Sequence, residues 1–173
     1  MTIRDAMERG DWDALSIEAI AERSGVSKAT IYRRWLDKEG LLAELLTGIT
    51  DAYPERPDTG DVSEDLLKVT RYLALMLQTP FGRSVTGAVA GSTNPELGAA
   101  AEQYWGYQFH GVSRLLQRYV RQGHIRPDAD LEAIAELLLS PIYMRAMITK
   151  AELDTEALRQ IVARAVGPYL VQD

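Results

Sequence analysis

The sequence predicts an all-α protein with a small N-terminal module over 1–46 and a larger helical domain over 47–173. Apolar residues recur at steps of three and four along most of the chain, which is typical of amphipathic helices. Runs of β-branched residues with strict alternation, which would indicate strands, do not occur. The hydrophobic fraction of 46% and the charged fraction of 25% are those of an ordinary globular protein.

The N-terminal module contains two short predicted helices joined by a tight turn. The first is expected over Ser16–Arg23, with Ser16 as its cap. Gly25 suits a left-handed residue after a helix, and Ser27 can cap the second helix, expected over Lys28–Trp35. This is the layout of a helix-turn-helix, whose second helix lies in the major groove of DNA. A pair of solvated amphipathic helices would give a similar pattern, and this alternative stays open.

The other elements follow from caps and breaks along the chain. Roughly two turns of helix are expected over Met1–Arg9. The segment between Tyr53 and Asp61 contains two prolines and a glycine, which predicts a loop. The remaining expected helices are the one capped by Asp37, Ser63–Gln78, Pro80–Ala90, Pro95–Gln122, Asp130–Lys150 and Asp154–Val171.

Charge is distributed unevenly along the chain. The net charge of the whole sequence is −6, which by itself argues against DNA as a partner. Between residues 23 and 38, however, five cations stand against the single anion Asp37, a net of +4. A basic segment on an acidic body suits a protein in which one face meets phosphates. An ordinary solvated helix face is the alternative reading of the same charges.

The residue types in the second helix of this motif suggest how it would contact DNA. Hydroxyl groups and a lysine ammonium can bind phosphates, whereas arginine can pair with the two acceptors of guanine. We expect phosphate contacts from the hydroxyls and from Lys38, and base contacts from Lys28 and the two arginines. The complete candidate DNA-binding set is Ser16, Lys28, Ala29, Thr30, Tyr32, Arg33, Arg34 and Lys38.

Residues 15–35 (LSIEAIAERSGVSKATIYRRW) and 37–42 (DKEGLL) resemble the N-terminal domain of the TetR/AcrR family of repressors. The resemblance implies a three-helix DNA-binding domain, a helical ligand-binding and dimerisation domain, and a homodimer that releases its operator when a small molecule binds. The positions that match family contacts are Thr30, Tyr32 and Lys38 with phosphates, Ser16 at the start of the second helix, and Lys28 and Arg34 with bases.

The first helix departs from the family pattern. In the family a longer helix, usually led by a basic arm, precedes the turn that is matched here by residues 10–14. Met1–Arg9 offers Ile3, Ala6 and Met7 as its apolar face, so the support for the other two helices is reduced. A helical ligand-sensing or partner-binding protein with impaired DNA binding is therefore the alternative function.

The C-terminal domain offers an aromatic-rich candidate ligand site. Aromatic side chains with a few polar groups are typical of small-molecule pockets, and also of plain helix-bundle cores, so both interpretations stay open. Arg145 lies on a predicted apolar stripe with Leu138, Ile142 and Ile148, and needs a carboxylate partner or an anionic ligand. The candidate ligand residues are Tyr72, Met76, Phe81, Tyr104, Trp105, Gln108, Phe109 and Arg145.

The last two helices are the predicted dimer surface, because helix pairs from two subunits can form a four-helix bundle. Internal packing of these helices is the alternative.

Several function classes are disfavoured by composition. The chain has no cysteine, which excludes a disulfide, a thiolate zinc site and a cysteine nucleophile. His110 and His124 are fourteen residues apart, which is not a metal-ligand spacing. Residues 82–88 have the glycine spacing of a phosphate loop but lack its Lys-Ser/Thr ending. We expect a cytoplasmic protein that is not an enzyme and needs no cofactor or metal.

Overall fold

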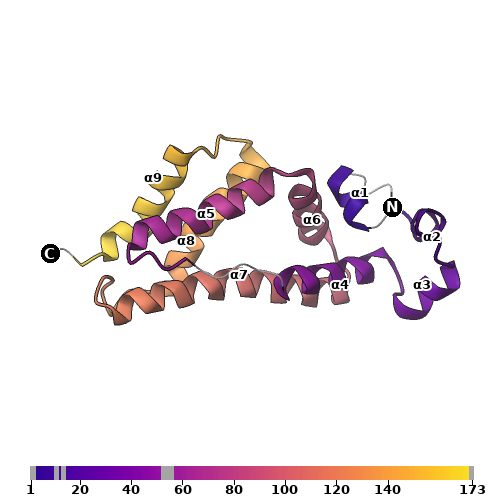
Figure 1. Cartoon of the computed structure of the whole chain (residues 1–173), viewed down its shortest axis with the longest axis horizontal. Helices are drawn as coiled ribbons and strands as arrows, with labels where there is room; N and C mark the ends of the chain where they lie inside the picture. The colour runs from indigo at the N-terminus through magenta and orange to yellow at the C-terminus, as the bar shows by residue number, and fades with distance from the viewer. Residues whose placement is uncertain (1–2, 10–11, 13–14, 52–56, 172–173) are drawn as a thin grey trace. The chain divides into compact units, whose positions relative to one another are not determined.

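The computed structural model describes residues 3–9, 12, 15–51 and 57–171, and these confirm the all-α fold (Figure 1). The α-helices are α1 (Ile3–Arg9), α2 (Ile17–Ser24), α3 (Lys28–Arg34), α4 (Lys38–Asp51), α5 (Val62–Gln78), α6 (Pro80–Gly91), α7 (Pro95–Arg121), α8 (Leu131–Tyr143) and α9 (Thr155–Val166). An isolated antiparallel bridge joins Ile125 and Leu170. Within the described ranges, no helix combines the length and the apolar character needed to cross a membrane.

The chain forms two compact units, each with its own core. The first comprises Met1–Tyr53 and Met76–Trp105, and the second comprises Pro54–Leu75 and Gly106–Asp173. The helices α5 and α7 therefore each contribute residues to both units. The division of the sequence into 1–46 and 47–173 stays a prediction about domains.

The core of the first unit joins the N-terminal helices to α6 and the start of α7. Met7 of α1 is fully buried, and α1 packs against α6. The helices α4 and α6 bury apolar residues in this cluster, and Tyr104 of α7 is only 4% exposed. Buried residues of α2 and α3 belong to the same apolar cluster, so the predicted helix-turn-helix shares one core with α6 and α7.

The second unit packs α8 against α9. Leu138 and Ile142 of α8 and Leu158 and Val162 of α9 are almost completely buried. The prediction of one helix up to Lys150 is wrong, because the α-helical pattern ends at Tyr143 and a π-helix follows over Met144–Thr149. A π-helix has a wider hydrogen-bond repeat, which rotates the residues that follow.

That rotation breaks the predicted apolar stripe. Ile148 is 70% exposed, whereas Leu138 and Ile142 are buried. The last helix is also shorter than expected, since α9 ends at Val166 and the 3₁₀ turn Gly167–Tyr169 follows. Pro168 in this turn has no N–H to continue the helical ladder.

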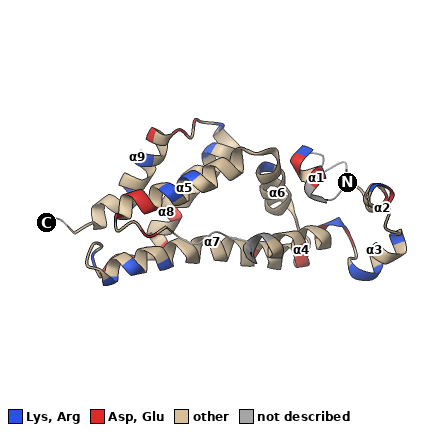
Figure 2. Ribbon diagram, viewed as in Figure 1, with Lys and Arg blue, Asp and Glu red and all other residues tan. Residues whose placement is uncertain are grey.

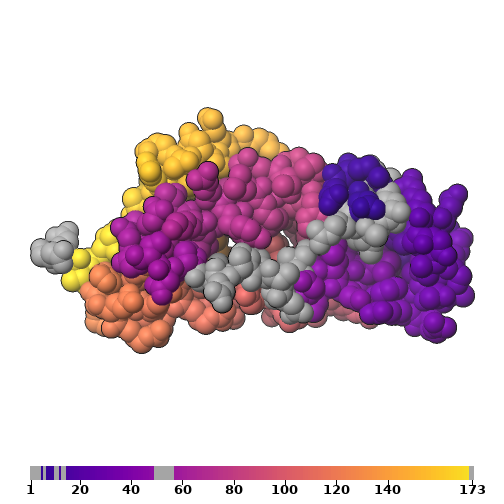
Figure 3. All heavy atoms as spheres, viewed as in Figure 1, coloured from indigo at the N-terminus to yellow at the C-terminus, as the bar shows by residue number. Residues whose placement is uncertain are grey.

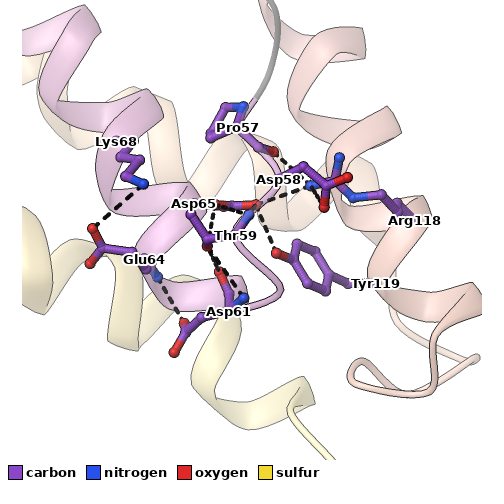
Figure 4. A network of polar contacts seen from close by, with 9 residues as sticks. All are labelled: Pro57, Asp58, Thr59, Asp61, Glu64, Asp65, Lys68, Arg118 and Tyr119. Atoms are coloured by element: carbon purple, nitrogen blue, oxygen red, sulfur yellow. Dashed lines mark hydrogen bonds and ion pairs between the residues drawn. The ribbon is translucent and has the colours of Figure 1, made fainter.

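A buried carboxylate fixes the segment that precedes α5 (Figure 4). Asp65 is fully buried, and it accepts hydrogen bonds from the Thr59 hydroxyl at 2.6 Å, the Tyr119 hydroxyl at 2.7 Å and Arg118 at 3.0 Å. Arg118 also donates to the carbonyl of Pro57 at 2.6 Å. Burial alone would raise the pKa of Asp65, but the bonds from Thr59 and Tyr119 and the Arg118 charge together lower it. The pKa of Tyr119 is raised by burial and by the Asp65 carboxylate.

Candidate nucleic-acid interface

The caps of α2 and α3 are those that the sequence predicts. The hydroxyl of Ser16 accepts from the N–H of Ala19 at 3.1 Å, and the hydroxyl of Ser27 accepts from the N–H of Thr30 at 3.2 Å. Gly25 ends α2 with φ at 72°, a left-handed conformation that glycine adopts without strain. Two short helices joined by a tight turn are therefore confirmed, and they pack into one continuous surface (Figure 3).

The outward face of α3 follows from helical geometry. Ile31 is 3% exposed and marks the inner side of the helix. Residues two positions away lie on the opposite side, because each residue turns the helix by about 100°. Ala29 and Arg33 therefore point outward and are exposed, and Tyr32 beside them is 47% exposed. Figure 2 marks the basic positions along α3.

Two of the candidate contacts are tied to the turn and to α2. Thr30 lies with its hydroxyl 2.9 Å from that of Ser27. Lys28 forms an ion pair with Glu18 of α2 at 3.3 Å, and both side chains are about half exposed. The pKa of Glu18 lies below its ordinary value because of a main-chain hydrogen bond at that residue and then because of the Lys28 ammonium. Lys28 would have to leave or share this carboxylate to bind DNA.

Arg34 is held by α4. Its guanidinium lies 2.7 Å from one oxygen of Glu44 and stacks over the Trp35 ring at 4.8 Å. The indole N–H of Trp35 donates to the other oxygen of Glu44 at 2.9 Å. Sequence reasoning did not single out Glu44, since nothing in its local pattern distinguishes it from a solvated acid. Arg34 lies beside the inner face of α3 and braces that helix against α4.

Lys38, a candidate phosphate contact, has partners within the first unit. It is the first residue of α4 and is half-buried. Its ammonium donates to the carbonyl of Trp12 at 3.0 Å and lies 4.8 Å from the centre of the Trp12 ring. Lys38 would therefore have to share its ammonium between this anchor and a phosphate.

The candidate ligand residues are distributed over both units. In the first unit Tyr104 is buried in the core, and Phe81 and Trp105 pack against that core, so these aromatic residues have a structural role there. Met76, in the same unit, is half-buried. In the second unit Gln108 is 3% exposed, Phe109 is half-buried and Tyr72 is 45% exposed.

Arg145 has a different partner from the carboxylate that was expected. Its guanidinium donates to the main-chain carbonyl of Glu152 at 2.8 Å, across the end of the π-helix. The bond spans the left-handed residue Lys150, whose φ is 54°. Arg145 thus closes this turn.

Two grooves lie within single units. One of about 570 Å³ is bordered by α2, α3 and the start of α4, and includes Val26, Thr30 and Trp35. The other, of about 530 Å³, lies between α7 and the segment that opens α8, and includes Arg114 and Asp130. Neither is lined by the candidate ligand residues. Among the described residues, no group of three or more His, Asp or Glu could hold a metal ion.

Two family models match the chain. Residues 2–45 match the model of bacterial regulatory proteins of the tetR family, and residues 56–165 match the tetracyclin repressor-like C-terminal domain. The uncharacterised HTH-type transcriptional regulator YdeS of Bacillus subtilis is 32% identical, over 92% of this chain and 81% of YdeS.

Solved structures share the fold. The crystal structure of the TetR family transcription regulator SCO0332 has a TM-score of 0.71 and 30% identity, and covers 93% of this chain and 90% of that one. FadR from Bacillus subtilis, solved in complex with stearoyl-CoA, has a TM-score of 0.73 and 18% identity, and covers 94% of this chain and 93% of FadR. At that identity the likeness to FadR shows the fold alone.

Proposed function

Because the chain belongs to the TetR family of transcriptional regulators, we propose that it is a repressor that binds a palindromic operator as a homodimer. We further propose that a small molecule releases it. The observation that carries the proposal is the exposed outer face of α3, with Ala29, Tyr32 and Arg33, on a helix whose inner face is fixed by Ile31. A rigid helix with polar residues on its free face is what major-groove reading needs.

Within this proposal the candidate residues take different parts. Arg33 faces outward and reads bases, with Ala29 and Tyr32 in contact with the groove. Hydroxyls at Ser16 and Thr30 and the ammonium of Lys38 bind phosphates and set the register. Lys28 and Arg34 contribute after exchanging or sharing their acidic partners.

The dimer is proposed to form through α8 and α9. The side of α8 that faces α9 is buried, yet Leu137 of α8 is 55% exposed, and Met144 and Ile148 of the π-helix are 53% and 70% exposed. Apolar side chains left on the outer side of a packed helix pair favour a second copy as their partner. A two-fold dimer would place two copies of α3 in major grooves one helical turn, or a multiple, apart.

The ligand is proposed to be a small molecule bound in the C-terminal domain. Tyr72, Gln108, Phe109 and Arg145 are the candidate residues of the second unit, and Met76, Phe81, Tyr104 and Trp105 are those of the first. FadR shows that a chain of this fold can hold stearoyl-CoA, which supports ligand control in general and names no ligand for this chain. The proposal includes no enzymatic activity, and it places the protein in the cytoplasm, with the DNA it controls.

Selection from a pool of random duplexes tests the function. The full chain should retain a palindromic sequence, and its affinity should fall steeply as salt rises, because phosphate contacts release counterions. Enrichment of no common sequence over several rounds would refute operator binding. Salt-independent retention would show that phosphates do not contribute.

A second candidate function is ligand or partner sensing without DNA binding. It is favoured by the acidic partners of two candidate base contacts, since Lys28 pairs with Glu18 and Arg34 pairs with Glu44. Thermal unfolding separates the two candidates, because only a binder is stabilised by an added duplex. A rise in Tm with the selected duplex, and none with a scrambled one, supports the repressor.

A further inference from the structure

A hydrogen bond ties the start of α7 to the start of α4 within the first unit. The side-chain amide of Asn94 donates to one carboxylate oxygen of Asp37 at 2.8 Å, although 57 residues separate them. The other carboxylate oxygen of Asp37 accepts from the N–H of Gly40 at 2.9 Å, in the first turn of α4. Asp37 therefore serves the helix cap and the long-range contact at the same time.

Asn94 also serves two helices. Its side-chain oxygen accepts from the N–H groups of Glu96 at 2.9 Å and Leu97 at 3.1 Å, and so caps α7. Its side-chain N–H₂ group donates to the Asp37 carboxylate. The two caps are thus joined by one bond between their side chains, and both residues are partly buried.

The two helix ends are close together beyond this single bond. A Cβ added to Gly40 would lie 3.2 Å from a carboxylate oxygen of Glu96, so the first turns of α4 and α7 face each other directly. Leu97, just beyond the Asn94 cap, is 1% exposed in the core that α4 shares. The contact is therefore specific in position and partly shielded from water, where a hydrogen bond to a charged group is stronger.

Asp37 occupies the junction between the recognition helix and α4. It follows the last residue of α3 by three positions, and the next residue is Lys38, which is anchored to the Trp12 carbonyl. The hydrogen bonds of Asp37 therefore act at the point where the chain passes from α3 into α4. α7 begins just beyond the Asn94 cap, at Pro95.

We propose that Asn94 is a positioning residue for DNA binding, which holds the junction of α3 and α4 in the arrangement that meets the operator. This inference rests on the proposed operator binding. In this role Asn94 would act through Asp37 and not by contact with DNA.

The test exchanges the two side chains. Asn94→Asp keeps an oxygen that caps α7, but sets a second carboxylate against Asp37. The double variant Asp37→Asn with Asn94→Asp restores the pair, because the new amide at position 37 can donate to the new carboxylate at position 94. The direction of the hydrogen bond is reversed, and each side chain keeps an oxygen that caps its own helix. The readout is the Kd for the duplex selected by the wild type, measured by fluorescence anisotropy well below the Tm of each variant.

Asn94→Asp should bind the operator about tenfold or more weakly, which corresponds to about 1.4 kcal/mol. The double variant should return to within about threefold of the wild type. A purely structural role would lower the Tm of Asn94→Asp and leave the Kd of the folded chain unchanged. That result overturns the inference, and so does a double variant that binds no better than Asn94→Asp.

The same experiment separates this inference from the proposed function. If the wild type selects no duplex, operator binding itself is refuted. If the wild type binds and Asn94→Asp binds equally well, only the positioning role fails. Should Asn94→Asp fold too poorly to be measured, recovery of both folding and affinity in the double variant still supports the pairing, and recovery of folding alone refutes the positioning role.

Discussion

Asp65→Asn removes the charge from a carboxylate that has no access to water. Four groups donate to this carboxylate: the N–H and hydroxyl of Thr59, the guanidinium of Arg118 and the hydroxyl of Tyr119. An asparagine amide keeps one acceptor oxygen and turns the other position into a donor, which then faces donors. The change therefore leaves buried groups without partners while it alters the volume of the side chain very little.

The magnitude follows from the geometry. Hydrogen bonds to charged groups contribute about 1.5–3 kcal/mol, and breaking a buried ion pair costs about 3–5 kcal/mol. Arg118 keeps the Pro57 carbonyl at 2.6 Å and the carboxylate of Asp58 at 3.3 Å, which reduces the loss. We expect a decrease of about 3 kcal/mol in the free energy of unfolding. For a chain of this size that lowers Tm by roughly 6–12 °C.

Urea and thermal unfolding followed by circular dichroism measure this loss. The matched control is Asp58→Asn, which removes the other carboxylate near Arg118 from a side chain that is 63% exposed. Exposed ion pairs contribute about 0–1 kcal/mol, so the control should stay close to the wild type. The reasoning would be refuted if the two variants lost equal stability, or if Asp65→Asn lost less than about 0.5 kcal/mol. Either result would show that the buried Asp65 carboxylate does not stabilise this hydrogen-bond network.

The pH dependence gives an independent check. The pKa of Asp65 in the folded protein lies below the ordinary value of a free aspartate, because Thr59 and Tyr119 donate to its carboxylate and Arg118 lies beside it. A carboxyl with a lowered pKa stabilises the fold above its unfolded pKa, and this contribution is lost as the pH falls through the folded pKa. The stability difference between wild type and Asp65→Asn should be constant near neutral pH and should shrink below about pH 4. A difference that widens on acidification would contradict the sign of the shift.

Two other variants have clear expected outcomes. Gly82→Ala should lower the free energy of unfolding, measured in urea, by more than about 2 kcal/mol, because the added Cβ would overlap the main-chain carbonyl of Met76. Gly87→Ala lies in the same helix, where the added Cβ meets open space. It should raise the free energy of unfolding by up to about 1 kcal/mol. Comparable losses in both would contradict this reading. Glu44→Gln should change the free energy of unfolding by less than about 1 kcal/mol, because the ion pair between Glu44 and Arg34 is half exposed. The variant releases Arg34 from this ion pair. Its affinity for non-operator DNA should therefore rise, and the salt dependence of that affinity should steepen by about one phosphate contact. The matched control is Glu22→Gln, which removes one negative charge from an exposed position in α2 and leaves the Arg34–Glu44 ion pair intact. If both variants change DNA affinity equally, the effect comes from the loss of one negative charge and not from the release of Arg34.

The local parts of the fold were predictable because their signals are local. Ser16, Gly25 and Ser27 act through hydrogen bonds and backbone angles within a few residues, and the structure confirms all three. The helix starts at Pro80 and Pro95 were found for the same reason. The sequence therefore defined the recognition helix and its caps nearly completely.

Contacts between distant residues were not predictable in this way. Asp65 lies on the apolar stripe of α5 with Val62, Leu66 and Val69, and a charge in such a stripe signals a buried partner. Two of its partners, Arg118 and Tyr119, come from α7, however, and spacing does not reveal them. The π-helix after Tyr143 likewise depends on packing and on the closing bond from Arg145, not on a periodic pattern.

The central claim is that the outer face of α3 reads operator DNA, and Arg33→Ala tests it most directly. Its matched control is Arg71→Ala, an exposed arginine of α5 in the second unit. Fluorescence anisotropy with the selected duplex, and with duplexes altered at each half-site base pair, should show a loss of about 1–3 kcal/mol and a relaxed preference at one position for Arg33→Ala. Arg71→Ala should bind like the wild type. An Arg33→Ala protein that keeps both the affinity and the base preference of the wild type would contradict the account.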